Sequence, residues 1–178
     1  MTDGVLPHKV EMRALAARTA DLVGHLDPAK LPRLQAAGAS GQSPVGVKAR
    51  FFRDEEGRYV LELAVEARVA VTCQRCLGEL EECLQSQTQL VALWSDADAG
   101  QLPARYDPLV VGEELDLWQA VEDELLLALP NYSYHNDIEC GSQSGVVVEP
   151  DDDNGIDGDD NGQQRSPFDV LKTLKQDS

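Results

Sequence analysis

Positive charge is scarce in this chain of 178 residues, which carries 15 Lys and Arg against 32 Asp and Glu, a formal net charge of −17 at pH 7. Affinity for nucleic-acid phosphates comes largely from Lys and Arg side chains that displace counterions, so the chain as a whole lacks the charge of a nucleic-acid binder. Its hydrophobic fraction of 42% is close to the globular norm. The composition therefore predicts a folded acidic protein, and basic molecules are the partners we expect.

Long apolar runs are also absent. No stretch approaches the roughly 18–20 apolar residues of a membrane span, and the N-terminal sequence MTDGVLPHKVEMR lacks the basic-then-apolar order of a signal peptide. We therefore expect a cytoplasmic protein without a membrane segment. In that reducing compartment the four cysteines favour metal or redox chemistry over a framework of structural disulfides.

Catalytic motifs are missing too. The chain has no Gly-rich phosphate loop, no nucleophile elbow and no recognisable Ser/His/Asp arrangement, so the sequence does not indicate an enzyme. The acidic triplet Glu122-Asp123-Glu124 is predicted to form a solvated helix face, because paired catalytic carboxylates would require a cleft.

The charge is distributed unevenly and divides the chain into segments. Residues 1–76 have a net charge of +2, residues 77–136 of −11, residues 137–164 of −9 and residues 165–178 of +1. Residues 141–164 are rich in Gly, Asp and Asn and contain too few apolar residues to offset the entropy of ordering, which predicts a disordered acidic linker. We expect a folded domain at 1–140, this linker at 141–164, and a short amphipathic motif at 165–178.

Apolar periodicity predicts an α+β fold for the domain. A helix is expected from Pro7 to about Val23, ended by Gly24, and a second short one from Asp27 to about Gly38. Period-two patterns predict antiparallel strands at 45–53, 59–72 and 80–94, with a short strand at 109–111. A capping box at Asp116 begins an amphipathic helix that ends at Pro130. The expected architecture is an antiparallel meander sheet packed by the N-terminal helices and one C-terminal amphipathic helix, followed by the disordered linker and a short terminal helix.

Two cysteines follow the long strand predicted at 59–72 in the pattern Cys73-x-x-Cys76, which the order of elements places in a turn. Such a turn is typical of a zinc knuckle, and His135 with Cys140 offers two further ligands after a gap of 58 residues. Cys73, Cys76, His135 and Cys140 therefore predict one structural zinc site. The alternative interpretation is that the cysteines are small packing residues and His135 a loop histidine. Cys83 is interpreted as a packing residue of its strand.

The terminal motif begins at Ser166, a suitable N-cap, and its apolar residues recur at helical spacing. Its characteristic residues are Pro167, Phe168, Leu171 and Leu174. A helix this short is marginal alone, so it is expected to dock on its own domain or to serve as a tethered recognition peptide, and the sequence leaves both open.

Several blocks together resemble one family. They are Leu6-Pro7, the CQRCL turn, a segment from Leu102-Pro103 to Leu109, VEDELLLALP at 121–130, the His and Cys beyond it, and a terminal PF-x-VL-x-x-LK. The chain closely resembles the YceD family, the large ribosomal RNA subunit accumulation proteins, over almost its whole length. The acidic linker departs from the family in being longer and richer in Asp and Gly.

The resemblance implies a non-enzymatic factor for ribosome biogenesis, needed for synthesis, processing or accumulation of the 23S rRNA, and supplies no catalytic residues. Its direct partner would be 23S rRNA or its precursor particle, or a basic large-subunit ribosomal protein held by the acidic segments. For the RNA partner the near-neutral first half offers a basic set: Arg13, Arg18, Lys30, Arg33, Lys48, Arg50, Arg53 and Arg58. The alternative function is a zinc- or redox-active CxxC protein built on Cys73 and Cys76. Oligomeric state is not indicated.

Overall fold

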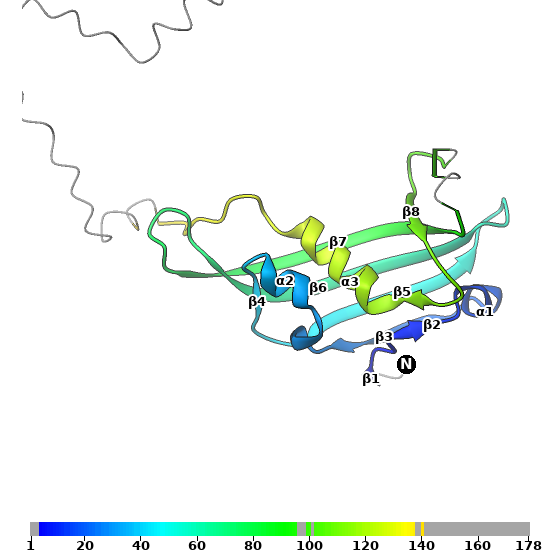
Figure 1. The fold of residues 1–178 in the computed structure, drawn as a ribbon, viewed down its shortest axis with the longest axis horizontal. Helices are drawn as coiled ribbons and strands as arrows, with labels where there is room; N and C mark the ends of the chain where they lie inside the picture. Colours follow the sequence, from blue (N-terminus) through cyan, green and yellow to red (C-terminus); the bar gives the residue numbers. More distant parts are fainter. Residues whose placement is uncertain (1–3, 96–98, 101, 138–139, 141–178) are drawn as a thin grey trace, which may run out of the picture. The chain divides into compact units, whose positions relative to one another are not determined.

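The computed structural model describes residues 4–95, 99–100, 102–137 and 140, so the linker and terminal motif predicted for 141–178 lie outside the described residues. Among the residues described, a seven-stranded sheet is accompanied by a few short helices (Figure 1). This content confirms the predicted α+β class. No helix in the described part of the chain combines the length and hydropathy needed to cross a membrane.

Three long strands form the centre of the sheet: β5 (Val45–Arg53), β6 (Tyr59–Thr72) and β7 (Glu79–Leu93). Each pairs antiparallel with the next along the chain. On β6 the residues at odd positions from Leu61 to Val71 are buried, as the period-two pattern predicts for a strand with one face on the core. The long predicted strands are therefore correct within one residue at each end.

Shorter strands extend the sheet. Strand β3 (Asp21–Leu26) pairs antiparallel with β5, and β1 (Gly4–Val5) runs parallel to β3. At the other edge β8 (Asp107–Val110) runs parallel to β7. Strand β4 (Ser40–Gly41) pairs with β6 on the same side as β5, beyond the residues of β6 that pair with the start of β5. Strands β2 (Lys9–Val10) and β9 (Leu115–Asp116) form a separate antiparallel pair.

The helix predicted from Pro7 to Val23 is wrong in extent. Only α1 (Met12–Ala17) is helical, and it lies between strands β2 and β3. Thr19 follows it with a φ of 49°, in the left-handed region, which turns the chain away from the helix axis. Gly24 is a buried residue inside β3 instead of a helix terminator. The Ala-rich stretch favours helix locally, but pairing with β5 draws residues 21–26 into the sheet.

The second predicted helix is divided into a 3-10 turn at Pro28–Lys30 and α2 (Pro32–Ala36). The predicted cap is present, because the Asp27 carboxylate accepts a hydrogen bond from the Ala29 N–H at 2.9 Å. Pro32 supplies no N–H, so it opens a new helix more readily than it continues the preceding turn.

Helix α3 (Leu117–Ala128) begins at the predicted cap, where the Asp116 carboxylate accepts a hydrogen bond from the Gln119 N–H at 3.0 Å. Leu117, Val121 and Leu125 are fully buried and join α1, α2 and the inner face of the sheet in one core. The prediction that the acidic triplet forms a solvated face is wrong, since Glu122 and Glu124 are only 5% and 7% exposed.

Candidate metal centre

The loop between β6 and β7 holds Cys73 and Cys76 in a tight turn, as the sequence predicted. The Cys73 N–H donates to the Gly78 carbonyl at 2.8 Å, and the Leu77 N–H donates to the Cys73 carbonyl at 2.9 Å. Leu77 has a φ of 60°, which reverses the chain within the turn. These constraints bring the two sulfur atoms to the same side of the loop as the segment that follows α3.

The segment after α3 runs back toward this loop (Figure 1). It is attached by a hydrogen bond from the Gln74 N–H to the Ser133 carbonyl at 2.9 Å, and Ser133 itself is buried. Residues 131–137 and Cys140, which follow the helix, therefore lie beside the β6–β7 loop although they are distant from it in the sequence.

Cys73, Cys76, His135 and Cys140 come together at this point, with one potential ligand atom from each lying within 4.8 Å of the others. The Cys73 and Cys140 Sγ atoms are 3.9 Å apart, and the Cys76 Sγ lies 3.3 Å from the His135 Nδ1. With zinc–sulfur bonds of about 2.3 Å, tetrahedral geometry places two thiolates about 3.8 Å apart. The cluster has the ligand types and spacing of a closed four-ligand site, which is the structural and not the catalytic kind of zinc site.

Hydrogen bonds orient the ligands from outside. The His135 Nε2 lies 3.0 Å from the Glu79 carbonyl, which can only accept, so Nε2 carries the proton and Nδ1 keeps its lone pair toward Cys76. The Gly78 N–H donates to the Cys76 Sγ at 3.4 Å. Arg75 donates to the Asp137 carbonyl at 2.9 Å and to the Cys140 Sγ at 3.6 Å.

The surroundings shift the pKa values of two thiols in opposite directions. Burial raises the pKa of Cys73, but hydrogen bonds involving the backbones of Cys76, Arg75 and His135 outweigh it and lower the pKa to about 5. Burial and hydrogen bonds with Cys73 and Cys76 raise the pKa of Cys140. Cys73 is thus a thiolate at neutral pH, the form that binds metals. The interpretation of Cys83 as a packing residue is wrong, because it is exposed on β7.

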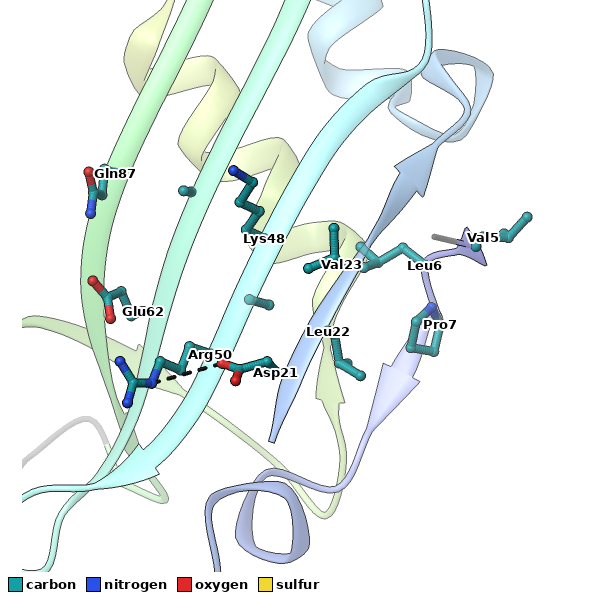
Figure 2. Close-up of a pocket in the computed structure, with 13 residues that line it drawn as sticks. Val5, Leu6, Pro7, Asp21, Leu22, Val23, Lys48, Arg50, Glu62 and Gln87 are labelled. Carbon is teal, nitrogen blue, oxygen red and sulfur yellow. Dashed lines mark ion pairs between the residues drawn. The ribbon is translucent and has the colours of Figure 1, made fainter. Parts of the chain in front are cut away.

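The basic residues predicted to contact RNA do not form one patch. Lys48 and Arg50 line a groove of about 660 Å³ on the sheet face opposite the helices, beside β1 and β3 (Figure 2). Asp21 and Glu62 line the same groove, and the Arg50 Nε lies 3.8 Å from an Asp21 carboxylate oxygen. The groove therefore holds as many acidic as basic side chains.

Two other predicted basic residues stack on aromatic rings. Arg13 lies over Trp94 at 4.1 Å from the ring centroid, and Arg53 lies over Tyr59 at 4.8 Å. The two rings themselves meet edge to face with centroids 5.5 Å apart. The two rings lie side by side with one arginine stacked on each, close to the β5–β6 hairpin.

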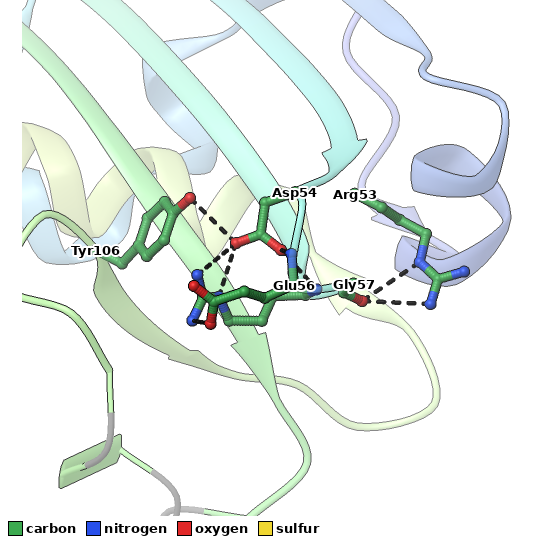
Figure 3. Close-up of polar contacts among 6 residues, drawn as sticks. Arg53, Asp54, Glu56, Gly57 and Tyr106 are labelled. Carbon is green, nitrogen blue, oxygen red and sulfur yellow. Dashed lines mark hydrogen bonds and ion pairs between the residues drawn. The ribbon is translucent and has the colours of Figure 1, made fainter.

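Arg58 is held by the hairpin turn, where its guanidinium pairs with Asp54 at 2.7 Å and with Glu56 at 2.6 Å. Figure 3 shows that the same Asp54 carboxylate also accepts a hydrogen bond from the Tyr106 hydroxyl. Arg33 pairs with Asp123 of α3, whereas Arg18 and Lys30 are exposed at separate places. Pro167, Phe168, Leu171 and Leu174 lie outside the described residues.

Sequence reasoning missed two buried carboxylates. The Glu122 Oε1 accepts hydrogen bonds from the Arg33 and Leu34 N–H groups at 2.7 and 3.1 Å, which caps the start of α2. The Glu124 Oε2 accepts from the Ser86 hydroxyl at 2.7 Å. The only signal was their helical spacing, which places them on either side of the apolar stripe of Val121 and Leu125.

Comparisons with known proteins identify the family of the chain. The family model described as "Large ribosomal RNA subunit accumulation protein YceD" matches residues 61–175. The chain belongs to the YceD family. The match spans the β6–β7 loop, α3, His135 and Cys140, and continues into the terminal motif.

A curated relative supports the assignment over nearly the whole length. The large ribosomal RNA subunit accumulation protein YceD of Haemophilus influenzae is 32% identical over 175 residues, which cover 96% of this chain and 97% of that protein. The resemblance to the YceD family seen in the sequence is therefore confirmed. No solved structure matches the chain.

Proposed function

We propose that this protein is a non-enzymatic, cytoplasmic ribosome biogenesis factor needed for synthesis, processing or accumulation of the 23S rRNA of the large ribosomal subunit. The observation that carries the proposal is membership of the YceD family, whose Haemophilus relative is named for large ribosomal RNA subunit accumulation. The protein would act by binding a component of the precursor particle.

The charges favour a basic large-subunit protein over rRNA as the direct partner. Residues 77–136 contain 12 acidic side chains against the single Arg105. Of the basic set in the first half, Arg33, Arg50 and Arg58 lie in ion pairs with Asp or Glu, which reduces the positive charge that they present to phosphates.

A depletion experiment tests the proposed function. In cells of the source bacterium lacking the gene, we expect the ratio of 23S to 16S rRNA and the amount of large subunits in sucrose gradients to fall. A plasmid copy of the full chain should restore both. Unchanged ratios and gradients in the deletion strain would contradict the proposal.

Filter binding of the full-length protein to 23S rRNA fragments, over a series of salt concentrations, separates the two partners. The protein-partner version predicts no salt-sensitive binding. Binding that weakens steeply as salt rises would instead show phosphate contacts and favour the basic set led by Arg13, Lys48 and Arg53.

We also infer that Cys73, Cys76, His135 and Cys140 hold one structural zinc ion, because three thiols and one correctly oriented imidazole nitrogen converge from two distant segments. A bound zinc would attach the segment after α3 to the β6–β7 loop. The redox alternative has less support, because the Cys73 side chain is fully buried, which leaves only Cys76 of the pair partly exposed to a disulfide on another protein.

Elemental analysis and thiol titration of freshly purified protein test the zinc site. We expect one zinc per chain in the wild type and in Cys83→Ser, and a loss of most of it in His135→Ala. Four rapidly reactive thiols without zinc would contradict the inference.

A further inference from the structure

Exposed apolar side chains gather around the candidate metal centre. Among the described residues eight large apolar or aromatic side chains are exposed, and three of them lie within three positions of a cluster residue: Leu77 at 77%, Tyr132 at 70% and Tyr134 at 46% exposure. We call these three residues, together with Arg75, the knuckle surface. An exposed leucine with two exposed tyrosines is the composition of a binding surface, in which aromatic anchors dominate the energy.

The backbone keeps these side chains outside. Leu77 lies between Cys76 and Gly78, which are both held to the cluster by hydrogen bonds, and its φ of 60° is fixed by the turn. Tyr132 and Tyr134 flank Ser133, which is buried and bonded to Gln74. The surface is therefore preformed by the same contacts that bring the four metal-ligating side chains together, and little ordering entropy remains to be lost on binding.

The charges around the surface are mostly negative. Glu79 and Glu81, at the start of β7, and Asp137 are exposed beside it. Arg75 is the basic residue of the surface, and its guanidinium is occupied by the Asp137 carbonyl, the Cys140 sulfur and the Tyr134 ring, 5.3 Å from its centroid. Phosphates would be repelled here, whereas Lys or Arg side chains would find carboxylates and tyrosine rings.

We propose that the knuckle surface docks a basic, lysine- or arginine-rich protein segment. The proposal rests on the proposed function, in which a component of the large-subunit precursor is the partner. Tyr132 and Tyr134 are the apolar anchors, and the Tyr132 ring takes a cationic side chain of the partner, as the Tyr134 ring already takes Arg75. Glu79 and Glu81 supply the rim charges that select a basic partner.

Binding to proteins extracted from purified large ribosomal subunits and freed of rRNA tests the surface. We expect the full-length Tyr132→Ala/Tyr134→Ala variant to bind at least tenfold more weakly than the wild type, while its metal content and melting temperature stay unchanged. Val110→Ala, which removes an exposed apolar side chain on β8, is the matched control and should bind like the wild type. Equal binding by the double variant would overturn the proposal.

Photocrosslinking in cells identifies the occupant. A full-length chain with p-benzoylphenylalanine in place of Tyr132 should crosslink to a basic segment of a large-subunit protein. Crosslinks to 23S rRNA, crosslinks to residues 165–178 of the same chain, or no crosslink would each overturn the proposal. Restoration of the 23S to 16S ratio by the wild-type chain is scored in parallel, so that failure of the proposed function is seen separately from failure of the docking surface.

Discussion

Glu122 illustrates at the scale of single residues how the fold uses charge in its interior. Its carboxylate is 5% exposed and accepts two backbone N–H groups at the start of α2. A helix start leaves such N–H groups without partners, and its dipole favours a negative charge there. Glu122 therefore joins α3 to α2, which explains why an acidic side chain lies on the buried face of an amphipathic helix.

Replacing Glu122 by Ala should lower the free energy of unfolding by about 2–3 kcal/mol, because two N–H groups lose a charged acceptor in a buried setting. The loss is measured by urea denaturation. Glu113→Ala, at an exposed position, is the control and should change stability by less than about 0.5 kcal/mol. Equal losses in the two variants would show that the capping contact does not stabilise the fold.

Asp54 is a second residue at which the effect of the surroundings on a carboxyl pKa can be measured. Burial raises its pKa, but hydrogen bonds from the Arg58 backbone and guanidinium, and from the Tyr106 hydroxyl, outweigh burial and hold the pKa below the ordinary value of 3.8. A carboxylate with a lowered pKa stabilises the fold at pH values above its ordinary pKa. That contribution disappears as the pH falls through the folded-state pKa.

We therefore expect Asp54→Asn to be less stable than the wild type by a constant amount between pH 7 and about pH 5, and the difference to shrink below pH 3.8. Thermal unfolding at a series of pH values measures it. A difference as large at pH 3 as at pH 7 would mean that the charge of Asp54 contributes nothing.

At the scale of elements, the edge of the sheet depends on close backbone approach. Strand β1 lies so near β3 that a Cβ on Gly24 would collide with the Gly4 carbonyl. Gly46, on the neighbouring β5, has more space, since the nearest atom to its ideal Cβ is the Glu66 carbonyl oxygen at 3.8 Å. Gly24 is thus required for the parallel pairing of β1 with β3.

Gly24→Ala should displace β1, destabilise the fold by about 1–3 kcal/mol and speed hydrogen exchange at the Leu6 amide, which donates to the His25 carbonyl. Gly46→Ala, the matched control, should leave that exchange unchanged. Hydrogen exchange with mass spectrometry measures both. Slow exchange at Leu6 in Gly24→Ala would contradict the role of Gly24.

The elements that the sequence predicts well are those with strong periodicity and local caps. Strands β5, β6 and β7 alternate over nine or more residues, and α3 has a cap at Asp116 and a proline after its end. The prediction for the N-terminal region was wrong because the strands there are two to six residues long and pair with strands that are distant in the sequence. Short segments of this kind carry too little periodicity to compete with a local helix preference.

At the scale of the whole molecule, the sequence predicted which residues could bind a metal and where they lie along the chain. It did not show that they lie close together in space. Cys73 and Cys76 carried a local spacing, whereas His135 and Cys140 joined them only because α3 and the segment after it return to the β6–β7 loop. The basic set does not form one patch, because three of its members pair with acidic side chains, two stack on the Trp94 and Tyr59 rings, and the rest lie elsewhere. A single sequence does not show which distant segments of the chain come into contact, so neither outcome could be predicted from it.

The contribution of the terminal motif, residues 165–178, is also a question about the whole molecule. The described elements all lie within the compact unit Met1–Gly145, and the family match continues to residue 175. Removing residues 165–178 should leave the melting temperature unchanged and weaken binding to the large-subunit proteins, because a tethered second contact raises affinity through effective concentration. Binding and thermal unfolding are measured on the same preparations. A marked fall in melting temperature would show instead that the motif docks on its own domain.

The proposed function and the proposed zinc site together give the central claim: the protein supports accumulation of the large-subunit rRNA, and it needs the zinc held by Cys73, Cys76, His135 and Cys140 to do so. The most direct measurement is the ratio of 23S to 16S rRNA in cells that lack the chromosomal gene and carry plasmid copies of the chain. The wild type and Cys83→Ser should restore the ratio, and Cys73→Ser/Cys76→Ser should leave it low. Full restoration by the double variant would contradict the account.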